Sequence, residues 1–401
     1  MRIGVDATFL APEGRYTGMG VYTRGLARGL VRATAALQGA PEIVLLGYGP
    51  RPADTPPELG WQALPTVPAG RLGPWLSHQV VLPWMARRLG LDVLHITGIN
   101  VRLSRPGVPF AAPCPLVITV HDVIPLAYYG RLGPPLPWRL QAAYRLAMLA
   151  VHRAAMIVAV SETSRRDILA HLRLRPERVR TVHNGLDFPA DRHTPAETGA
   201  ILARLGIAPP YLLYAGSYEP RKNLLGTVAA YRLALARRDL PPLVLLVERE
   251  SGHRAAAMAQ IERSGLAGRL HFLHTLPDDD LAVLYRQAAL FLYPSFYEGF
   301  GFVPLQAQAA GVPVIAAGAG SLPEVLGEAA VYVDPSSPED LAAAILRVLD
   351  DPALDTSLRA GGPARASRFR WETAARRMLD IYADAALQTS PPLPQGAGVK
   401  G

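Results

Sequence analysis

Cysteine is almost absent from this 401-residue sequence, which contains only Cys114. A single cysteine excludes an internal disulfide framework and a cysteine-rich metal site. It agrees with a reducing compartment. We therefore expect a cytoplasmic protein, either free or at the inner face of a membrane.

Long apolar runs are also missing. No stretch of about 18 apolar residues is free of charges, so the sequence predicts no transmembrane helix. The most apolar candidate, residues 146–160, is interrupted by His152 and Arg153. Residues 1–6 lack the basic segment and the apolar run of a signal peptide, and they indicate a first β-strand. Half of the chain is apolar and only 18% is charged, so a large core can be buried.

Lysine is scarce, because arginine outnumbers it 39 to 2. Residues 1–187 hold 21 arginines, no lysine and 11 acidic residues, a net charge of +10; residues 188–401 hold 20 basic and 22 acidic residues, a net charge of −2. This asymmetry indicates either an anionic partner for the N-terminal half or a solvated arginine surface. No nucleic-acid-binding module accompanies it, so we expect no nucleic acid as partner.

Apolar runs of strand length alternate with helical patterns along the chain. Continuous Val, Ile and Leu runs separated by helices are typical of parallel sheets covered on both faces, and two such sets predict an α/β protein of two doubly wound domains. The runs of the first set are residues 3–6, 43–47, 93–96, 116–120, 156–160 and 179–182. Those of the second set are residues 211–215, 243–247, 270–273, 290–293, 313–316 and 330–333.

The pattern also predicts the domain boundaries. Residues 188–208 are expected to be a linker between domains 1–187 and 209–370, because a polar stretch without clear period is followed there by Pro209-Pro210. Residues 371–388 form a helical pattern, and the Pro- and Gly-rich residues 391–401 are expected to be disordered.

A helical pattern over residues 138–154 mixes apolar residues with arginine and histidine. A basic amphipathic helix can lie on an anionic membrane, and peripheral association is therefore one hypothesis. More often such a helix packs its apolar face on its own core.

Two candidate sites lie in the N-terminal half, each after a predicted strand. Gly18 and Gly20 precede a helical pattern; glycine allows close backbone approach, and a helix N-terminus favours an anion. His121 and Asp122 follow the strand 116–120, where ligands of open α/β sheets bind. Each motif alone is equally compatible with an ordinary loop.

Two stronger candidates lie in the C-terminal half. Arg221 and Lys222 form a cationic pair beside a helix start and can neutralise a diphosphate; an exposed basic pair is the alternative. After the strand 290–293, Glu298 enters a glycine-rich turn before a helix that begins near Val303. A carboxylate beside exposed backbone amides can hold sugar hydroxyls and an anion.

These residues resemble glycosyltransferase family 4, whose members share the GT-B fold. The resemblance covers nearly the whole chain and is most specific over residues 293–335. It implies two Rossmann-like doubly wound parallel-sheet domains facing across a cleft. The N-terminal domain would bind the acceptor, the C-terminal domain the nucleotide-sugar, and the helix 371–388 would return to the N-terminal domain.

The resemblance also implies roles for single residues. The catalytic group would be Glu298, His121, Arg221 and Lys222. The donor would be bound by Gly18, Gly20, Ser217, Gly299, Phe300, Gly301 and Gln306. The acceptor-side candidates are Asp122, Ser161 and Asn184. The family retains anomeric configuration, and we expect neither a metal nor a cofactor.

The sequence departs from the family pattern at three places. Gln306 stands where a second glutamate commonly accepts from the ribose hydroxyls, Ser217 stands where many members have arginine, and residues 248–250 replace a glycine-containing turn. Loss of the charge at Gln306 is expected to weaken ribose binding by about 1–2 kcal/mol.

The sequence therefore predicts a retaining hexosyltransferase, with GDP-mannose as the favoured donor and a glycan or lipid-linked acceptor. A UDP-sugar-dependent transferase of the same fold is the first alternative. An epimerase or phosphorylase, or a nucleotide-sugar-binding protein with an impaired donor site, are the others.

Overall fold

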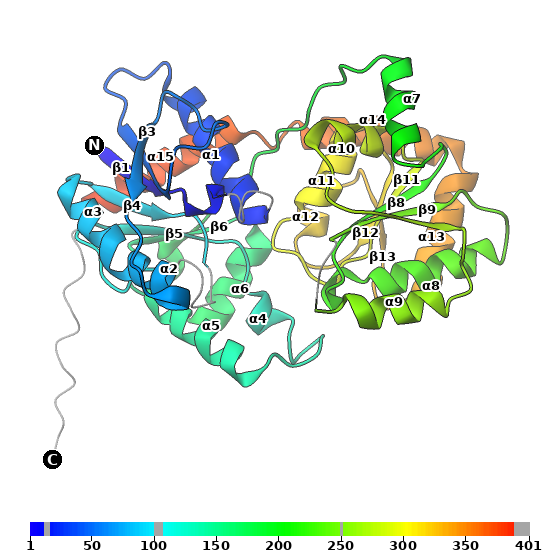
Figure 1. Cartoon of the computed structure of the whole chain (residues 1–401), viewed down its shortest axis with the longest axis horizontal. Coiled ribbons are helices and arrows are strands. Elements are labelled where there is room, and N and C mark those ends of the chain that lie inside the picture. Colours follow the sequence, from blue (N-terminus) through cyan, green and yellow to red (C-terminus); the bar gives the residue numbers. More distant parts are fainter. Residues whose placement is uncertain (12–16, 100–106, 249–251, 389–401) are drawn as a thin grey trace. The chain divides into compact units, whose positions relative to one another are not determined.

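The computed structural model describes residues 1–11, 17–99, 107–248 and 252–388. By its contacts the chain divides into two compact units (Figure 1). The N-terminal unit consists of Met1–Ala127, Pro135–Gly185 and the chain from Arg370 onward. The C-terminal unit consists of Tyr128–Pro134 and Leu186–Phe369. The predicted disordered tail, residues 391–401, lies outside the described residues.

The N-terminal unit is built on a parallel sheet of seven strands in the order β3-β2-β1-β4-β5-β6-β7. All six predicted apolar runs of the first half are strands. The seventh, β3, escaped prediction because its sequence GWQAL has no apolar run and it occupies an edge with only one residue fully buried. The strands are β1 (Arg2–Asp6), β2 (Glu42–Tyr48), β3 (Gly60–Leu64), β4 (Val93–Ile96), β5 (Leu116–Val120), β6 (Met156–Ala159) and β7 (Val179–Thr181).

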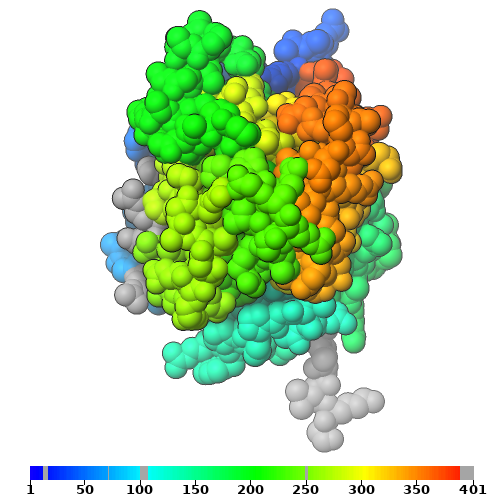
Figure 2. Space-filling view, turned by 90° about the vertical axis from the view of Figure 1, so that its right-hand side faces the viewer, coloured from blue at the N-terminus to red at the C-terminus, as the bar shows by residue number. Residues whose placement is uncertain are grey.

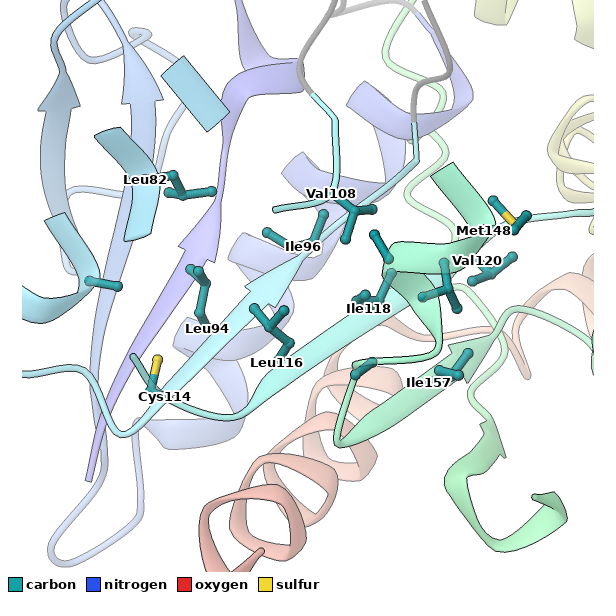
Figure 3. Packing of buried hydrophobic residues seen from close by; sticks show 14 of the residues in the cluster. Leu82, Leu94, Ile96, Val108, Cys114, Leu116, Ile118, Val120, Met148 and Ile157 are labelled. Carbon is teal, nitrogen blue, oxygen red and sulfur yellow. The ribbon is translucent and has the colours of Figure 1, made fainter. Parts of the chain in front are cut away.

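Side chains alternate between the two faces of this sheet. One face carries Leu94 and Ile96 of β4 into a core cluster with α3 (Leu82–Arg88) and α5 (Trp138–Val151). Figure 3 shows Leu82 of α3 and Met148 of α5 directed at this face. These two helices therefore cover the same side of the sheet.

The opposite face is covered by α1 (Gly18–Thr34) and α15 (Trp371–Leu387), which contact each other. A Cβ at Gly25 would come within 2.0 Å of the Trp371 ring, and one at Gly29 within 2.3 Å of the Trp371 carbonyl. Glycine at these two positions allows the helices to approach closely. Short helices of this unit are η1 (Thr8–Leu10), η2 (Gly70–Leu72), α2 (Gly73–Leu76), η3 (Ser77–Val81), α4 (Ile124–Ala127) and η4 (Pro176–Arg178); α6 spans Glu162–Leu172.

The C-terminal unit contains a parallel sheet of six strands in the order β10-β9-β8-β11-β12-β13. All six predicted runs of the second half are strands. They are β8 (Leu212–Gly216), β9 (Leu243–Val247), β10 (Leu270–Leu273), β11 (Leu290–Tyr293), β12 (Val314–Ala317) and β13 (Val331–Val333). The prediction of two doubly wound parallel-sheet domains is thus confirmed.

Helices cover both faces of this second sheet. In the space-filling view α8 (green) lies against α13 (orange), and the two helices are in contact (Figure 2). The helices are α8 (Leu224–Leu235), α9 (Arg254–Glu262), α10 (Asp278–Arg286), α11 (Phe302–Ala309), α12 (Leu322–Leu326), α13 (Pro338–Asp350) and α14 (Pro352–Ala366), with the short η5 (Pro220–Lys222).

The segment 188–208, expected as a linker, contains helix α7 (Pro195–Arg204). A reciprocal capping box between Thr194 and Glu197 starts this helix, and α7 contacts α10 of the C-terminal unit. The helix was missed because the preceding residues are polar and because Leu202 is the only residue of α7 that is fully buried. Throughout the described residues, no helix combines the length and the apolar character needed to cross a bilayer.

Each sheet has one point at which the strand order reverses. In the C-terminal unit the reversal lies between β8 and β11, and in the N-terminal unit between β1 and β4. Ligands of doubly wound sheets bind beyond the carboxyl ends of the strands at such points. The predicted residues Gly18, His121, Arg221, Lys222 and Glu298 follow strands at or next to these reversals, whereas Ser161 and Asn184 follow β6 and β7.

Candidate functional site

The C-terminal candidate site forms because β8 and β11 are neighbours. The loop after β8 carries Arg221 and Lys222 on η5, and the loop after β11 carries Glu298. The Arg221 carbonyl joins the loops: it accepts from the Phe296 amide at 2.9 Å and from the Ser295 hydroxyl at 3.2 Å. Two motifs 76 residues apart therefore meet at the carboxyl ends of two neighbouring central strands.

Glu298 is the centre of this cluster, and its side chain is only 10% exposed. A single carboxylate oxygen, Oε1, accepts four hydrogen bonds. Its donors are Ser295 Oγ at 2.6 Å, Lys222 Nζ at 2.8 Å, Arg221 Nη1 at 2.9 Å and the Tyr293 hydroxyl at 3.1 Å. Such a charge-assisted network fixes the carboxylate in one orientation.

The electrostatics of the cluster keep Glu298 ionised. Burial alone would raise the pKa of the Glu298 carboxyl, but the charges of Lys222 and Arg221, with the hydrogen bonds, outweigh it and hold the pKa at about 2. At neutral pH the residue is therefore a hydrogen-bond acceptor and not an acid.

The second carboxylate oxygen, Oε2, differs from the first. Among the described residues it receives no hydrogen bond, and it is not one of the fully buried unpaired atoms. Oε1 thus receives all four of these hydrogen bonds, and Oε2 receives none from the described residues. This division suits a carboxylate that accepts from ligand hydroxyls.

The loop that follows β12 holds the backbone of Glu298 in place. The Ser321 hydroxyl donates to the Glu298 carbonyl at 3.0 Å, and the Ser321 amide does so at 3.2 Å. Gly320 has φ +60° and lies so close that a Cβ there would be 2.8 Å from the Glu298 amide nitrogen. Glycine is therefore required at this position.

The residues after Glu298 lead into helix α11. Gly301 is its N-cap with φ +97°, a conformation that favours glycine. The Phe300 ring is buried against Phe302 and Phe369, so only its backbone can face a ligand. Gln306 lies half-buried in the second turn of α11, and Ser217 accepts from the Glu219 amide at 3.3 Å. Their donor-binding roles remain predictions.

In the N-terminal unit, Gly18 and Gly20 form the first turn of α1. Gly18 is exposed, with open space where a side chain would be. The Gly20 amide already donates to the Thr17 hydroxyl, at 3.2 Å. A helix N-terminus is thus present, but one of its amides is used in capping.

His121 lies at the carboxyl end of β5, half-buried, beside the Tyr22 ring. Its Nε2 is 2.9 Å from the Thr97 carbonyl, an acceptor, so Nε2 carries the proton. Burial lowers the pKa of His121 to about 4, against the opposing effect of the Thr97 hydrogen bond. His121 is consequently neutral at pH 7, with Nδ1 as a hydrogen-bond acceptor.

The three acceptor-side candidates differ in their surroundings. Asp122 accepts from the Ile124 amide at 3.0 Å, which supports the start of α4. Ser161 is the N-cap of α6 and accepts from the Ser164 amide at 2.9 Å. Asn184 is buried after β7, and within the described part of the chain neither amide atom of its side chain has a partner. Asn184 alone of the three makes no side-chain hydrogen bond within the described residues.

We predict a loss of stability in mild acid because of two histidines. Burial lowers the pKa of His95 to about 3, and His95 binds Thr119 and Tyr382 through its two ring nitrogens. The unfolded chain takes up protons on both His95 and His121 below about pH 6.5, whereas the folded chain does so only near pH 4 and below. Each histidine should therefore cost about 2 kcal/mol of unfolding free energy between pH 7 and pH 5.

Urea unfolding at the two pH values tests this prediction. His121→Asn should reduce the acid-induced loss by about 2 kcal/mol. His152→Gln, at an exposed histidine, is the control and should leave the loss unchanged. Equal pH dependence in wild type and His121→Asn would contradict the assignment.

Several residues of these clusters were not predicted from the sequence. Tyr293 and Ser295 bind Glu298 directly; their only signal is a polar group at the end of a buried strand. In the N-terminal unit, Asp6 Oδ2 lies 3.2 Å from Nε2 of the fully buried His78, whose Nδ1 is 2.9 Å from the Tyr48 hydroxyl. Nothing in the sequence connects these three residues, which the sheet and η3 bring together.

The described residues contain no group of three His, Cys, Asp or Glu side chains that could hold a metal ion. Independence from metals and cofactors nevertheless remains a prediction.

Two family models match this chain. The one described as Glycosyltransferase Family 4 matches residues 16–188, and the one described as Glycosyl transferases group 1 matches residues 203–365. The first lies almost entirely within the N-terminal unit and the second within the C-terminal unit.

The chain is also similar in sequence to known glycosyltransferases. The chain is 35% identical over 235 residues to O-antigen chain mannosyltransferase B of Escherichia coli, covering 57% of this chain and 60% of that protein. It is 32% identical to D-inositol 3-phosphate glycosyltransferase 1 of Catenulispora acidiphila, over 83% of this chain and 80% of that protein.

Among solved structures, HepE of Anabaena in complex with UDP-glucose has a TM-score of 0.71 at 18% identity, covering 96% of this chain and 99% of that chain. This likeness concerns the fold alone. The two family models and the relative aligned over four fifths of its length lead to one conclusion: the chain belongs to glycosyltransferase family 4.

Proposed function

We propose that this protein is a retaining mannosyltransferase that moves a mannosyl group from GDP-mannose to a glycan acceptor. The observation that carries the proposal is the Glu298 cluster, a fixed carboxylate paired with the buried Arg221 and the half-buried Lys222 at the strand-order reversal of the C-terminal sheet. Because the chain spans only 60% of the length of mannosyltransferase B, that relative supports the reaction type without establishing it.

The cationic pair suits a diphosphate leaving group. Lys222 has three N–H donors, of which two bind Tyr293 and Glu298 at 2.7 and 2.8 Å. We assign the third to a donor phosphate. Arg221 Nη1 is held by Glu298 and by the Tyr297 carbonyl, so its guanidinium is preorganised before the donor arrives. Preorganised charges stabilise the developing diphosphate without reorganisation during the reaction.

Glu298 and His121 have different parts in this proposal. Oε2 of Glu298 accepts hydrogen bonds from hydroxyls of the donor sugar. His121 accepts a hydrogen bond from a sugar hydroxyl at Nδ1. A neutral His121 cannot supply a positive charge to the leaving group. The charge compensation therefore falls to Arg221 and Lys222.

The reaction proceeds with retention if the acceptor attacks from the side on which the diphosphate leaves. The bond between the anomeric carbon and the donor phosphate oxygen breaks as the bond to the acceptor oxygen forms. The leaving phosphate takes the acceptor's proton, so no covalent nucleophile on the protein is needed. Binding both partners together supplies the proximity.

UDP-glucose is the second candidate donor. It is favoured by the likeness in fold to HepE, which was solved with that molecule. GDP-mannose is preferred here because mannosyltransferase B is a relative in sequence and not only in fold. We further propose that the acceptor glycan is lipid-linked and that the protein works at an anionic membrane surface.

Gln306→Glu is expected to tighten nucleotide-sugar binding. If Gln306 faces the ribose hydroxyls, a carboxylate there restores a charged acceptor worth about 1–2 kcal/mol, or roughly tenfold in Kd. Titration calorimetry of wild type and variant with the preferred donor measures the change. An unaltered Kd would remove Gln306 from the donor site.

A thermal-shift panel of GDP-, UDP-, ADP- and dTDP-sugars tests the choice of donor. We expect the largest rise in Tm with GDP-mannose. Product analysis with and without acceptor then separates the reaction types: transfer needs the acceptor, whereas an epimerase converts the donor alone and a phosphorylase needs phosphate. Binding without turnover would indicate a nucleotide-sugar-binding protein with an impaired site.

A further inference from the structure

One segment carries a net positive charge almost as large as that of the whole chain, because it contains very few acidic residues. Residues 59–161 contain nine arginines, no lysine and only two acidic residues, Asp92 and Asp122, a net charge of +7 against +8 for the whole chain. The segment includes helices α3 and α5 of the N-terminal unit. A field of one sign on one part of a protein attracts an anionic partner.

Helix α5 has apolar side chains on two faces, one that packs on the core and one that is exposed to solvent. Tyr144 and Met148 point into the core, as expected for a helix that covers a sheet. On the outer side, Trp138, Leu146 and Leu149 are 73%, 48% and 59% exposed. Spacings of eight and three residues place them along one face of the helix. Packing on the core explains the apolar residues of the inner face but not those of the exposed face.

Arginines accompany this outer stripe. Arg139 and Arg145 on α5, and Arg153 just after it, are exposed, and the helix has no acidic residue. The Arg139 guanidinium lies 5.4 Å from the centre of the Trp138 ring. Exposed tryptophan and leucine interleaved with arginine are typical of helices that lie in a membrane interface.

Helix α3 and the preceding turn η3 repeat the pattern. Val80 is 60% and Trp84 is 50% exposed, and Arg87 and Arg88 are exposed beside them. The inner side of α3 enters the same core cluster as α5, through Leu82. Figure 3 shows Leu82 and Met148 of the two helices directed at the same face of the sheet, so the exposed side chains of both helices lie on the side away from that face.

We propose that these outer sides form one membrane-binding surface for an anionic lipid bilayer, which we call the basic apolar surface. It consists of Val80, Trp84, Arg87, Arg88, Trp138, Arg139, Arg145, Leu146, Leu149 and Arg153. Exposed apolar groups of this size mark an interaction site. A bilayer fits better than a protein because it supplies anionic headgroups and an apolar layer over the whole surface at once.

The inference deepens the proposed work at a membrane and rests on that part of the proposed function. It does not depend on the identity of the donor. A surface that holds the protein at the bilayer would present lipid-linked acceptors without occupying the Glu298 cluster.

Vesicle co-sedimentation of the full chain tests the surface. We expect binding to vesicles of phosphatidylcholine mixed with phosphatidylglycerol, little binding to phosphatidylcholine alone, and weakening with salt. Each of the variants Arg139→Gln and Arg145→Gln should lower the partition coefficient about fivefold. The double variant Trp138→Ser/Leu149→Ser should lower it by about tenfold or more.

Matched controls come from exposed residues elsewhere. Leu387→Ser changes a leucine that is 85% exposed on α15, and Arg347→Gln changes an exposed arginine on α13. Neither should alter vesicle binding, and all variants should keep the Tm of the wild type and transfer to a soluble acceptor. Loss of binding with retained transfer supports the surface and separates it from failure of the proposed function.

Two outcomes would overturn the proposal. One is equal partitioning of wild type and the Trp138→Ser/Leu149→Ser variant. The other is absence of vesicle binding together with a concentration-dependent dimer that the same variant abolishes, since the surface would then bind a second copy of the chain.

Discussion

Replacing Glu298 by glutamine is expected to lower kcat/KM by about 100-fold, and replacing it by alanine by about 1,000-fold or more. Glutamine keeps one acceptor oxygen, but it loses the charge that lies between Arg221 and Lys222. Alanine removes both carboxylate oxygens, and with them the proposed contact between Glu298 and the donor sugar. Steady-state transfer with the preferred donor measures both effects.

The two variants also differ in stability. Alanine leaves the buried Arg221 and the half-buried Lys222 without their shared carboxylate, a loss of about 3–5 kcal/mol for a broken buried pair. A stability measurement must therefore accompany the activity of Glu298→Ala, and Glu298→Gln is the cleaner test. Asp280→Asn is the control, because Asp280 is a buried carboxylate paired with Arg204 instead. It should lose stability and keep activity; equal activity loss in both would indicate a general structural effect.

Replacing Lys222 by glutamine is the second large perturbation, with an expected loss of about 100- to 1,000-fold in kcat. The change removes a charge from the leaving group and a hydrogen bond from Glu298. Lys222→Arg restores the charge but replaces a compact ammonium by a planar fork, so partial recovery is expected. Single-turnover kinetics isolates the chemical step.

Tyr293→Phe provides the matched comparison for Lys222. The Tyr293 hydroxyl accepts from Lys222 and donates to Glu298, so its loss loosens both groups without removing a charge. We expect about a tenfold decrease. If Lys222→Gln were no more harmful than Tyr293→Phe, the ammonium would not act on the diphosphate.

Much of the fold could be predicted because buried parallel strands are continuous apolar runs. Twelve runs became twelve strands, and the helix that begins at Trp371 has the predicted start. The edge strand β3 has no such run, and α7 is short, with Leu202 as its only fully buried residue. Both are elements with one exposed face, where the sequence pattern is weakest.

The candidate site was only partly predictable. The sequence placed Arg221, Lys222 and Glu298 after strands, but their contact depends on the neighbouring positions of β8 and β11, which no local pattern contains. The sequence suggested a carboxylate that binds sugar. The structure adds that one of its oxygens holds both cations, so that the sugar and diphosphate contacts are joined in one network.

The stereochemistry of transfer tests the central claim most directly. GDP-mannose carries an α-linked mannosyl group, and NMR of the product formed with a glycan acceptor reports the configuration of the new bond. We expect an α-mannoside that forms only with acceptor present, with wild-type protein and not with Glu298→Ala. A β-mannoside, or an α-mannoside formed equally well by Glu298→Ala, would contradict a retaining transferase built around Glu298.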